Sequence, residues 1–169
     1  FIVPLFNVFF TRKHAATPEQ IGAIFALGDV TIAIGTLLAP VVSSKLGMVR
    51  SVAFTELISI PFIFGIAISP NLGFAAVSYF ARGSLMNMGG PIRNNFTMEV
   101  VLESERATTS GLTIMADNIP RAVSAGLAGQ IMKGGNYDLP YFATSIMYFA
   151  AGTLFLLFFH KTEKKQETP

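Results

Sequence analysis

The sequence contains no cysteine and few charged residues. Without cysteine the chain has no disulfide framework, no zinc site built on thiolates and no thiol nucleophile. Only 13% of the 169 residues are charged, about half of the roughly 25% found in an average soluble domain. Because 51% of the residues are hydrophobic and the mean hydropathy is +0.55, the chain lacks the polar surface that an ordinary soluble protein or a disordered chain requires. The net charge of +2 is too small for a nucleic-acid-binding surface.

Sequence signals of an enzyme are also absent. The histidines His14 and His160 fall at the expected water-facing ends of helices, which gives neither a histidine proton relay nor a histidine metal site. No glycine-rich loop followed by Lys-Ser or Lys-Thr occurs, which argues against an ATP-driven pump. The lack of cysteine and of clustered acids disfavours an enzyme embedded in the membrane. We therefore expect no catalytic residue, no cofactor and no metal, and a function in binding and proton movement.

Long apolar runs fill most of the chain. A helix that spans a bilayer needs about 20 mostly apolar residues. Five runs of this length are present: 21–44, 51–69, 72–91, 107–132 and 139–159. Residues 1–10 form a sixth, shorter run, which we interpret as the end of a truncated helix, so that the chain is expected to be part of a longer protein. Residues 160–169 are expected to form a cytoplasmic tail.

Local signals mark where these helices begin and end. Thr17 with Gln20 predicts a capping box, Asn71 and Ser104 predict N-caps, and Gly134-Gly135 predicts a helix end. Loops this short make neighbouring helices antiparallel. Beyond Pro91 we expect a separate short interfacial helix within 92–106. The pattern thus predicts an all-α, polytopic membrane helix bundle.

The basic residues predict the orientation in the membrane. Seven Lys and Arg residues fall on one side and three on the other, with the remaining two of twelve inside spans. The richer side is expected to be cytoplasmic; its residues are Lys45, Arg50, Arg93, Arg106, Lys161, Lys164 and Lys165. The protein is then a multi-pass protein of the cell membrane with a cytoplasmic C-terminus.

Several residues between Arg82 and Leu112 form a recognisable pattern. They are Arg82, Met86-Asn87, Pro91, Met98-Glu99, Glu105-Arg106 and Ser110-Gly111-Leu112. This stretch resembles the tenth helix, its cytoplasmic connection and the eleventh helix of the major facilitator superfamily. Residues 40–50 resemble the family's signature loop between helices eight and nine, in which Lys45, Gly47 and Arg50 match. Pro40 and Ser44 depart from it, and Ser44 replaces the acid on which the loop's locking role depends.

The resemblance covers essentially the whole chain as helices seven (partial) to twelve. It implies the C-terminal six-helix lobe of a secondary transporter, formed by residues 1–159, whose partner is a missing N-terminal six-helix lobe. Such a transporter moves a small solute across the lipid bilayer by alternating access, with protons as a candidate coupling ion. The alternative is an accessory or receptor-like membrane protein that uses the same scaffold without transport.

Ionisable residues at membrane depth need an explanation, because each costs about 2.5–3.5 kcal/mol on insertion scales. They are Asp29, Glu56, Arg82, Asp117 and Arg121. Glu56 lies close to a span end, where its side chain can reach the interface. Asp117 and Arg121 are four residues apart and share one helix face.

We interpret the other four residues, Asp29, Arg82, Asp117 and Arg121, as belonging to a polar cavity at mid-membrane. The resemblance makes Arg82 and Asn87 its main candidates, with Asn7 as a further one. An arginine there favours an anionic or carboxylate-bearing solute, and a desolvated Asp29 or Asp117 can carry a coupling proton. The alternative is that Asp117, Arg121 and Arg82 neutralise one another as a structural cluster.

Two prolines are expected to bend their helices. Pro120 lies between Asp117 and Arg121, and Pro61 lies within 51–69. A proline inside a helix removes one backbone hydrogen bond and kinks the helix. Such bends suit helices that move against a partner lobe.

Overall fold

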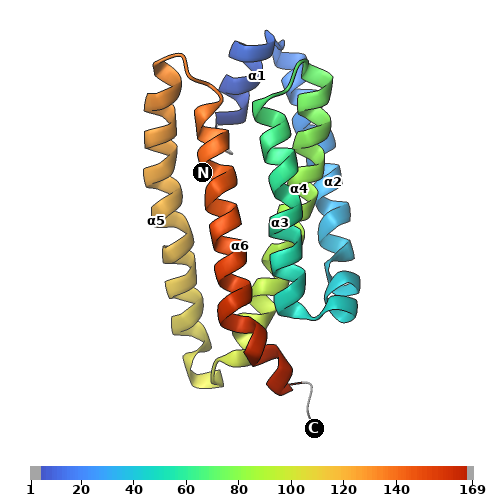
Figure 1. Cartoon of the computed structure of the whole chain (residues 1–169), viewed down its shortest axis with the longest axis vertical. Coiled ribbons are helices and arrows are strands. Elements are labelled where there is room, and N and C mark those ends of the chain that lie inside the picture. Colours follow the sequence, from blue (N-terminus) through green and yellow to red (C-terminus); the bar gives the residue numbers. More distant parts are fainter. Residues whose placement is uncertain (1–4, 167–169) are drawn as a thin grey trace.

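The computed structural model describes residues 5–166, with the side chains of residues 5–159. In this part of the chain the structure is all-α and contains no strand, as the apolar pattern predicted (Figure 1). Its elements are α1 (Phe6–His14), α2 (Pro18–Leu46), α3 (Met48–Ala67), α4 (Leu72–Val100), the 3-10 turn η2 (Glu103–Glu105), α5 (Arg106–Lys133) and α6 (Leu139–Gln166). Consecutive long helices run in opposite directions and are joined by short loops (Figure 1). The chain forms an up-and-down bundle.

Helix α4 is longer than the sequence suggested. It passes through Pro91 without interruption and ends at Val100, so the separate short helix expected beyond Pro91 is not formed. The proline removes a single backbone hydrogen bond, and long helices tolerate this where neighbouring elements pack around the site. The extension places Arg93 within the helix rather than in a loop.

Most of the predicted helix ends have the expected caps. Thr17 accepts a hydrogen bond from the backbone N–H of Gln20, whose side chain in turn accepts one from Thr17, which completes the capping box. Asn71 accepts from the backbone N–H of Phe74 at 2.9 Å. The prediction for Ser104 is wrong, because this residue lies inside η2 and helix α5 begins without a side-chain cap.

Three of the described helices are long and apolar enough to cross a membrane: α2, α3 and residues Leu139–Phe159 of α6. Helices α4 and α5 have 29 and 28 residues, which is also sufficient length for a bilayer. Their sequences are more polar, because they carry Arg82, Arg93, Asp117 and Arg121. These charged side chains make α4 and α5 less apolar than α2 and α3.

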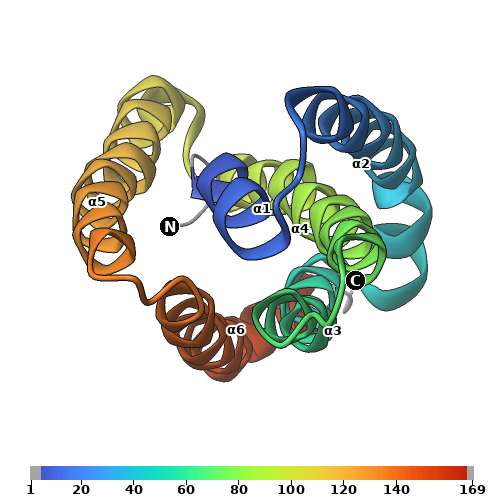
Figure 2. The same cartoon turned by 90° about the horizontal axis from the view of Figure 1, so that it is seen from above.

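Helix α3 packs between α4 and α6, and α2 packs against the other side of α4. Seen from above, α1 lies inside an arc that runs from α2 through α4, α3 and α6 to α5 (Figure 2). The phenylalanines of α1 that face this interior, Phe6, Phe9 and Phe10, are fully buried. Helix α5 stands at the open end of the arc, and only Ser124, Ala128 and Met132 on one face of it are buried.

Glycines allow α2 and α4 to approach closely. A Cβ atom on Gly35 would lie 2.7 Å from the carbonyl oxygen of Ser84, and one on Gly28 would lie 2.6 Å from the ring of Tyr79. Both distances are shorter than normal van der Waals contacts. Helices that associate in a membrane use small residues in this way, because lipid leaves little hydrophobic driving force between them.

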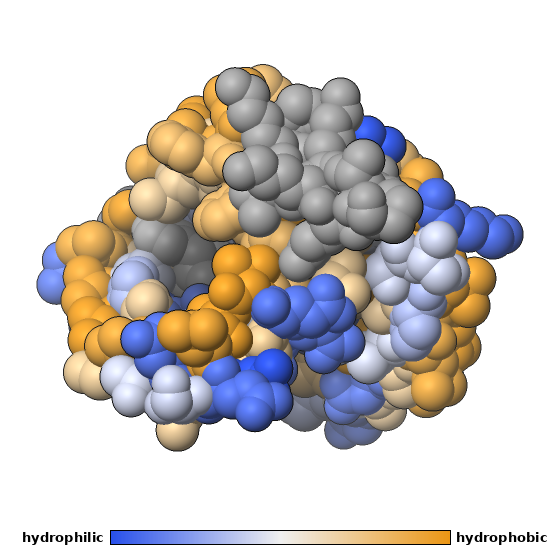
Figure 3. Space-filling view, turned by 90° about the horizontal axis from the view of Figure 1, so that it is seen from below, coloured by the Kyte–Doolittle hydropathy of each residue, from blue (hydrophilic) through white to orange (hydrophobic). Residues whose placement is uncertain are grey.

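The surface of the bundle divides into apolar flanks and polar ends. Seen from below, hydrophilic residues gather at the end where the helices are connected, with hydrophobic residues along the sides (Figure 3). The sides carry exposed large hydrophobic residues such as Leu37, Leu112, Ile146 and Phe158. A soluble domain would not expose so many, whereas a lipid-facing surface requires them.

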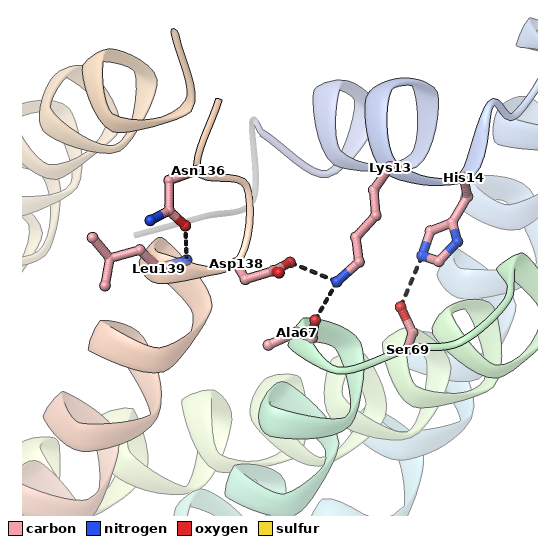
Figure 4. A network of polar contacts seen from close by, with 7 residues as sticks. All are labelled: Lys13, His14, Ala67, Ser69, Asn136, Asp138 and Leu139. Carbon is pink, nitrogen blue, oxygen red and sulfur yellow. Dashed lines mark hydrogen bonds and ion pairs between the residues drawn. The ribbon is translucent and has the colours of Figure 1, made fainter. Parts of the chain in front are cut away.

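A polar network ties three connections together at the opposite end (Figure 4). The Lys13 ammonium group pairs with Asp138 at 2.6 Å and donates to the carbonyl of Ala67 at the end of α3. The His14 imidazole forms a hydrogen bond of 2.8 Å with the Ser69 hydroxyl. This network fixes the end of α1 to the α3–α4 and α5–α6 connections.

We expect Gly35→Ala to destabilise the bundle. The added Cβ would collide with the backbone of Ser84, and such overpacking costs about 1–3 kcal/mol. Gly22→Ala is the matched control on the same helix, because a Cβ there meets open space. Thermal unfolding of the purified protein should show a lower midpoint for Gly35→Ala and an unchanged or slightly higher one for Gly22→Ala. Equal midpoints for the two variants would contradict the close α2–α4 contact.

We expect acid to weaken the network around His14. Its pKa is lowered from the usual 6.5, first because burial disfavours the charged imidazole and then because of Lys13, while Asp138 acts in the opposite direction. The folded protein therefore binds this proton less tightly than the unfolded chain. The contribution of neutral His14 to stability is complete above pH 6.5 and is lost as the pH falls through the lowered pKa. Unfolding midpoints measured across this range should fall with pH, and His14→Gln should flatten that dependence; an unchanged slope in the variant would show that other groups cause it.

Candidate functional site

Arg82 lies near the middle of α4 and is almost completely buried. Its exposed fraction is 6%, and within the described residues it forms neither a hydrogen bond nor an ion pair. The buried Nε atom has no hydrogen-bond partner there. Leaving an arginine unpaired in an apolar environment is costly, so a chain that retains one has either a structural or a functional use for it.

One aromatic ring lies against this guanidinium group, and two tyrosine rings contact that ring in turn. The guanidinium carbon of Arg82 lies 5.6 Å from the centre of the Phe6 ring, close enough for a cation–π contact. The Phe6 ring in turn contacts Tyr79 edge-on at 4.8 Å and Tyr141 at 5.6 Å between ring centres. These residues, Arg82, Phe6, Tyr79 and Tyr141, are called the Arg82 cluster below. It brings together side chains from α1, α4 and α6.

The Arg82 cluster contains unused hydrogen-bonding capacity. Besides Arg82 Nε, the buried hydroxyl of Tyr141 has no partner among the described residues. Buried polar groups are nearly always satisfied, so such exceptions call for a ligand, a water molecule or a role in function. Guanidinium N–H donors and a phenol hydroxyl are both groups that bind the acceptor oxygens of an anion.

The two asparagines proposed for the same cavity are not part of this cluster. Asn87 is exposed on α4, and its amide nitrogen donates to the Gly83 carbonyl at 2.8 Å within the same helix. Asn7 is also exposed, and its side-chain oxygen accepts from the Thr11 hydroxyl at 3.4 Å. Both amides are bonded within their own helices.

The ion pairs in the structure differ from those that the sequence suggested. Asp117 pairs neither with Arg82 nor with Arg121; its partner is Arg93 on α4, with 3.9 Å between Oδ2 and Nη2. Arg93 also lies 3.7 Å from Glu56 of α3, measured from Nη1 to Oε1. The Glu56 side chain is only 13% exposed, so it does not extend into water as its position near a span end suggested.

Arg93 and Glu56 are the site residues that sequence reasoning missed. Arg93 was counted among loop residues because the helix was expected to end at Pro91. The signal in the sequence was its position only two residues after Pro91, because a helix that continues past this proline includes Arg93. Asp117 and Arg93, with side chains 48% and 45% exposed, also face a polar cleft between α4 and α5.

The remaining candidates lie on exposed surfaces. Asp29 is exposed on α2, with its charge within electrostatic range of the Tyr79 hydroxyl. Arg121 is exposed on α5 and forms no ion pair within the described residues. Pro61 and Pro120 lie inside α3 and α5, which continue through them.

Residues 40–50, which the resemblance assigned to a loop, are helical on both sides of a sharp turn at Gly47. Gly47, with φ 82° and ψ 161°, joins α2 directly to α3, and this backbone conformation is essentially restricted to glycine. Lys45 and Arg50 flank the turn and are exposed. In the part of the chain that the structure describes, no group of three or more His, Asp or Glu side chains is placed to hold a metal ion.

Comparison with known proteins agrees with this architecture. The family model described as Major Facilitator Superfamily matches residues 1–169. No curated protein and no solved structure matches the chain significantly. Since the family model covers the whole chain, and since the described part is an all-α bundle with helices apolar enough to cross a membrane, this membrane protein belongs to the major facilitator superfamily of transporters.

Proposed function

We propose that this chain is the C-terminal lobe of a secondary transporter that moves a small anionic solute by alternating access. The observation that carries the proposal is Arg82, a buried guanidinium group with unused donors in the middle of a membrane-crossing bundle. Membership of the family supports a transporter in general, and the arginine supports a solute that carries a carboxylate or a similar group. In this proposal the chain works with an N-terminal six-helix lobe in the cell membrane, with its C-terminus in the cytoplasm.

The aromatic surroundings of Arg82 strengthen the argument for an anion. Arg82 is almost completely buried and its guanidinium group lies over the Phe6 ring, which makes its attraction for a negative charge stronger than it would be in solution. The Tyr141 hydroxyl adds a second group for hydrogen bonding without adding charge. An anion bound at Arg82 would give its partnerless Nε atom a hydrogen-bond acceptor.

Asp29 and Asp117 are the proposed proton carriers. Both are carboxylates within long helices of the bundle, and both are accessible in this conformation. A carboxylate that exchanges a proton between two conformations must be reachable from water in at least one of them. The accessory or receptor-like function on the same scaffold is the competing proposal, and transport measurements separate the two.

We expect Arg82→Ala to weaken anion binding strongly while the protein still reaches the membrane. Losing the charged hydrogen bonds should weaken binding of small carboxylates such as lactate or benzoate about tenfold or more. Arg121→Ala is the matched control, because Arg121 is exposed on α5. Binding is measured as the rise in unfolding midpoint that the carboxylate produces in the purified protein, and transport as uptake into proteoliposomes. Uptake by Arg82→Ala at the wild-type rate would remove Arg82 from the site, and binding without any uptake would favour the receptor-like alternative.

We expect a neutral variant at the true proton carrier to uncouple transport from the pH gradient. Asp29→Asn and Asp117→Asn keep side-chain size but can no longer exchange a proton. In proteoliposomes the variant at the carrier should lose stimulation by an imposed pH gradient and retain exchange of solute without a gradient. If both variants remain fully gradient-driven, neither carboxylate is the obligatory proton carrier.

A further inference from the structure

Little of Arg82 can be reached from water in this conformation. Its exposed fraction is 6%, and Phe6, whose ring lies against it, is fully buried. Phe9 and Tyr141 are fully buried as well, with 4.6 Å between their ring centres. These three rings, Phe6, Phe9 and Tyr141, are called the aromatic layer below. Two of them belong to α1, so the face of Arg82 that Phe6 covers becomes accessible when α1 moves away.

The Lys13–Asp138 ion pair lies next to the aromatic layer. The Lys13 ammonium group is 2.6 Å from Asp138 (Figure 4), and it also lies 5.2 Å from the centre of the Phe9 ring. Asp138 directly precedes α6, and its carbonyl accepts a hydrogen bond of 3.0 Å from the backbone N–H of Tyr141. The pair therefore joins the two segments that contribute rings to the aromatic layer, α1 and the start of α6.

Helix α1 depends on the polar contacts at its end more than the longer helices do. The most closely packed helix pairs are α3–α4, α2–α4 and α3–α6, and α1 belongs to none of them. Ala15, which follows α1, has φ 50° and ψ 34°, a left-handed conformation that residues with a Cβ atom rarely adopt. The adjacent bonds of Lys13 and His14 hold the backbone in this conformation. Breaking them would let this end of α1 move and relax.

We propose that the Lys13–Asp138 ion pair controls the access of a solute to Arg82. While the pair is formed, the aromatic layer covers Arg82; when it breaks, α1 moves away with Phe6 and uncovers the guanidinium group. The two side chains are 23% and 42% exposed, so water reaches the pair, and ion pairs at such positions are weak enough to break and form again. The inference rests on the proposed anion site for its use, but the movement of α1 can be measured without any solute.

Thiol labelling of the purified protein measures this movement. Because the chain has no cysteine, Ala75→Cys introduces a single thiol, which is seven residues before Arg82 and so on the same face of α4. Ala75 is fully buried in the apolar cluster that contains the aromatic layer. Ala39→Cys is the matched control, because Ala39 is buried in a separate apolar cluster. Maleimide should label both thiols slowly while the Lys13–Asp138 pair is intact.

Asp138→Asn should speed up labelling at position 75 several-fold and leave position 39 unchanged, because the charged hydrogen bond that opposes the movement is lost. Asparagine suits the start of a helix as well as aspartate does, so the variant removes mainly the charge. Glu19→Gln, the same chemical change at an exposed acid in the first turn of α2, should label at the wild-type rate. An unchanged rate at position 75 in Asp138→Asn would overturn the proposal, and so would faster labelling at both positions, which would show a general loosening of the bundle.

A cross-link tests the same movement in the opposite direction. Lys13→Cys and Asp138→Cys, introduced together and joined by a short bifunctional maleimide that contains a cleavable disulfide, fix α1 to the α5–α6 connection. Uptake of benzoate into proteoliposomes should stop on cross-linking and return when the linker is cleaved by a reductant. Uptake that continues in the cross-linked protein would overturn the proposal. Faster labelling at position 75 in Asp138→Asn without any benzoate uptake by the wild-type protein would contradict the anion transport and still support control of access to Arg82 by the ion pair.

Discussion

Charged groups between packed helices need partners, and α4 meets this requirement at two arginines. At Arg82 the compensation comes from the face of the Phe6 ring of α1, which in turn contacts Tyr79 of α4 and Tyr141 of α6. At Arg93 it comes from carboxylates on α3 and α5. Because these partners belong to four other helices, the position of α4 determines where those helices can place their polar groups. The glycines of α2, which bring a further helix against α4, complete this arrangement.

The helix ends show which features local sequence can predict. The caps at Thr17 and Asn71 depend on residues three positions apart, and the end of α5 depends on the adjacent Gly134. Such interactions form within one turn and are decided by residue type. Pro91 shows the opposite case: its local preference is to end a helix, yet α4, which packs against α2 and α3, continues through it. A contact made by distant segments overrides the local preference there.

The candidate site likewise has one feature that the sequence predicts and others that depend on how the helices pack. Arg82 stands out in the sequence because a charge in the middle of an apolar run is expensive wherever its neighbours lie. Its aromatic surroundings could not be predicted, since Phe6 and Tyr141 lie far from Arg82 along the chain. The pairing of Asp117 with Arg93 was missed for a related reason: the helical repeat brings Asp117 close to Arg121 on one face, but it says nothing about which neighbouring helix faces that side chain. Side-chain direction between helices is a property of packing, and a single sequence carries little information about it.

The ion pair between Lys13 and Asp138 also bears on how the bundle assembles. It joins residues 125 positions apart in the chain, and closing so long a segment carries a large loop-closure entropy. Contacts between distant segments form late unless intervening structure has already brought the ends together. This ion pair therefore forms only after the α5–α6 connection has reached the same side of the membrane, whereas the contacts of Lys13 with Ala67 and of His14 with Ser69 require only the α3–α4 connection. This bridge thus acts as a closing step in assembly, made once the intervening helices have crossed.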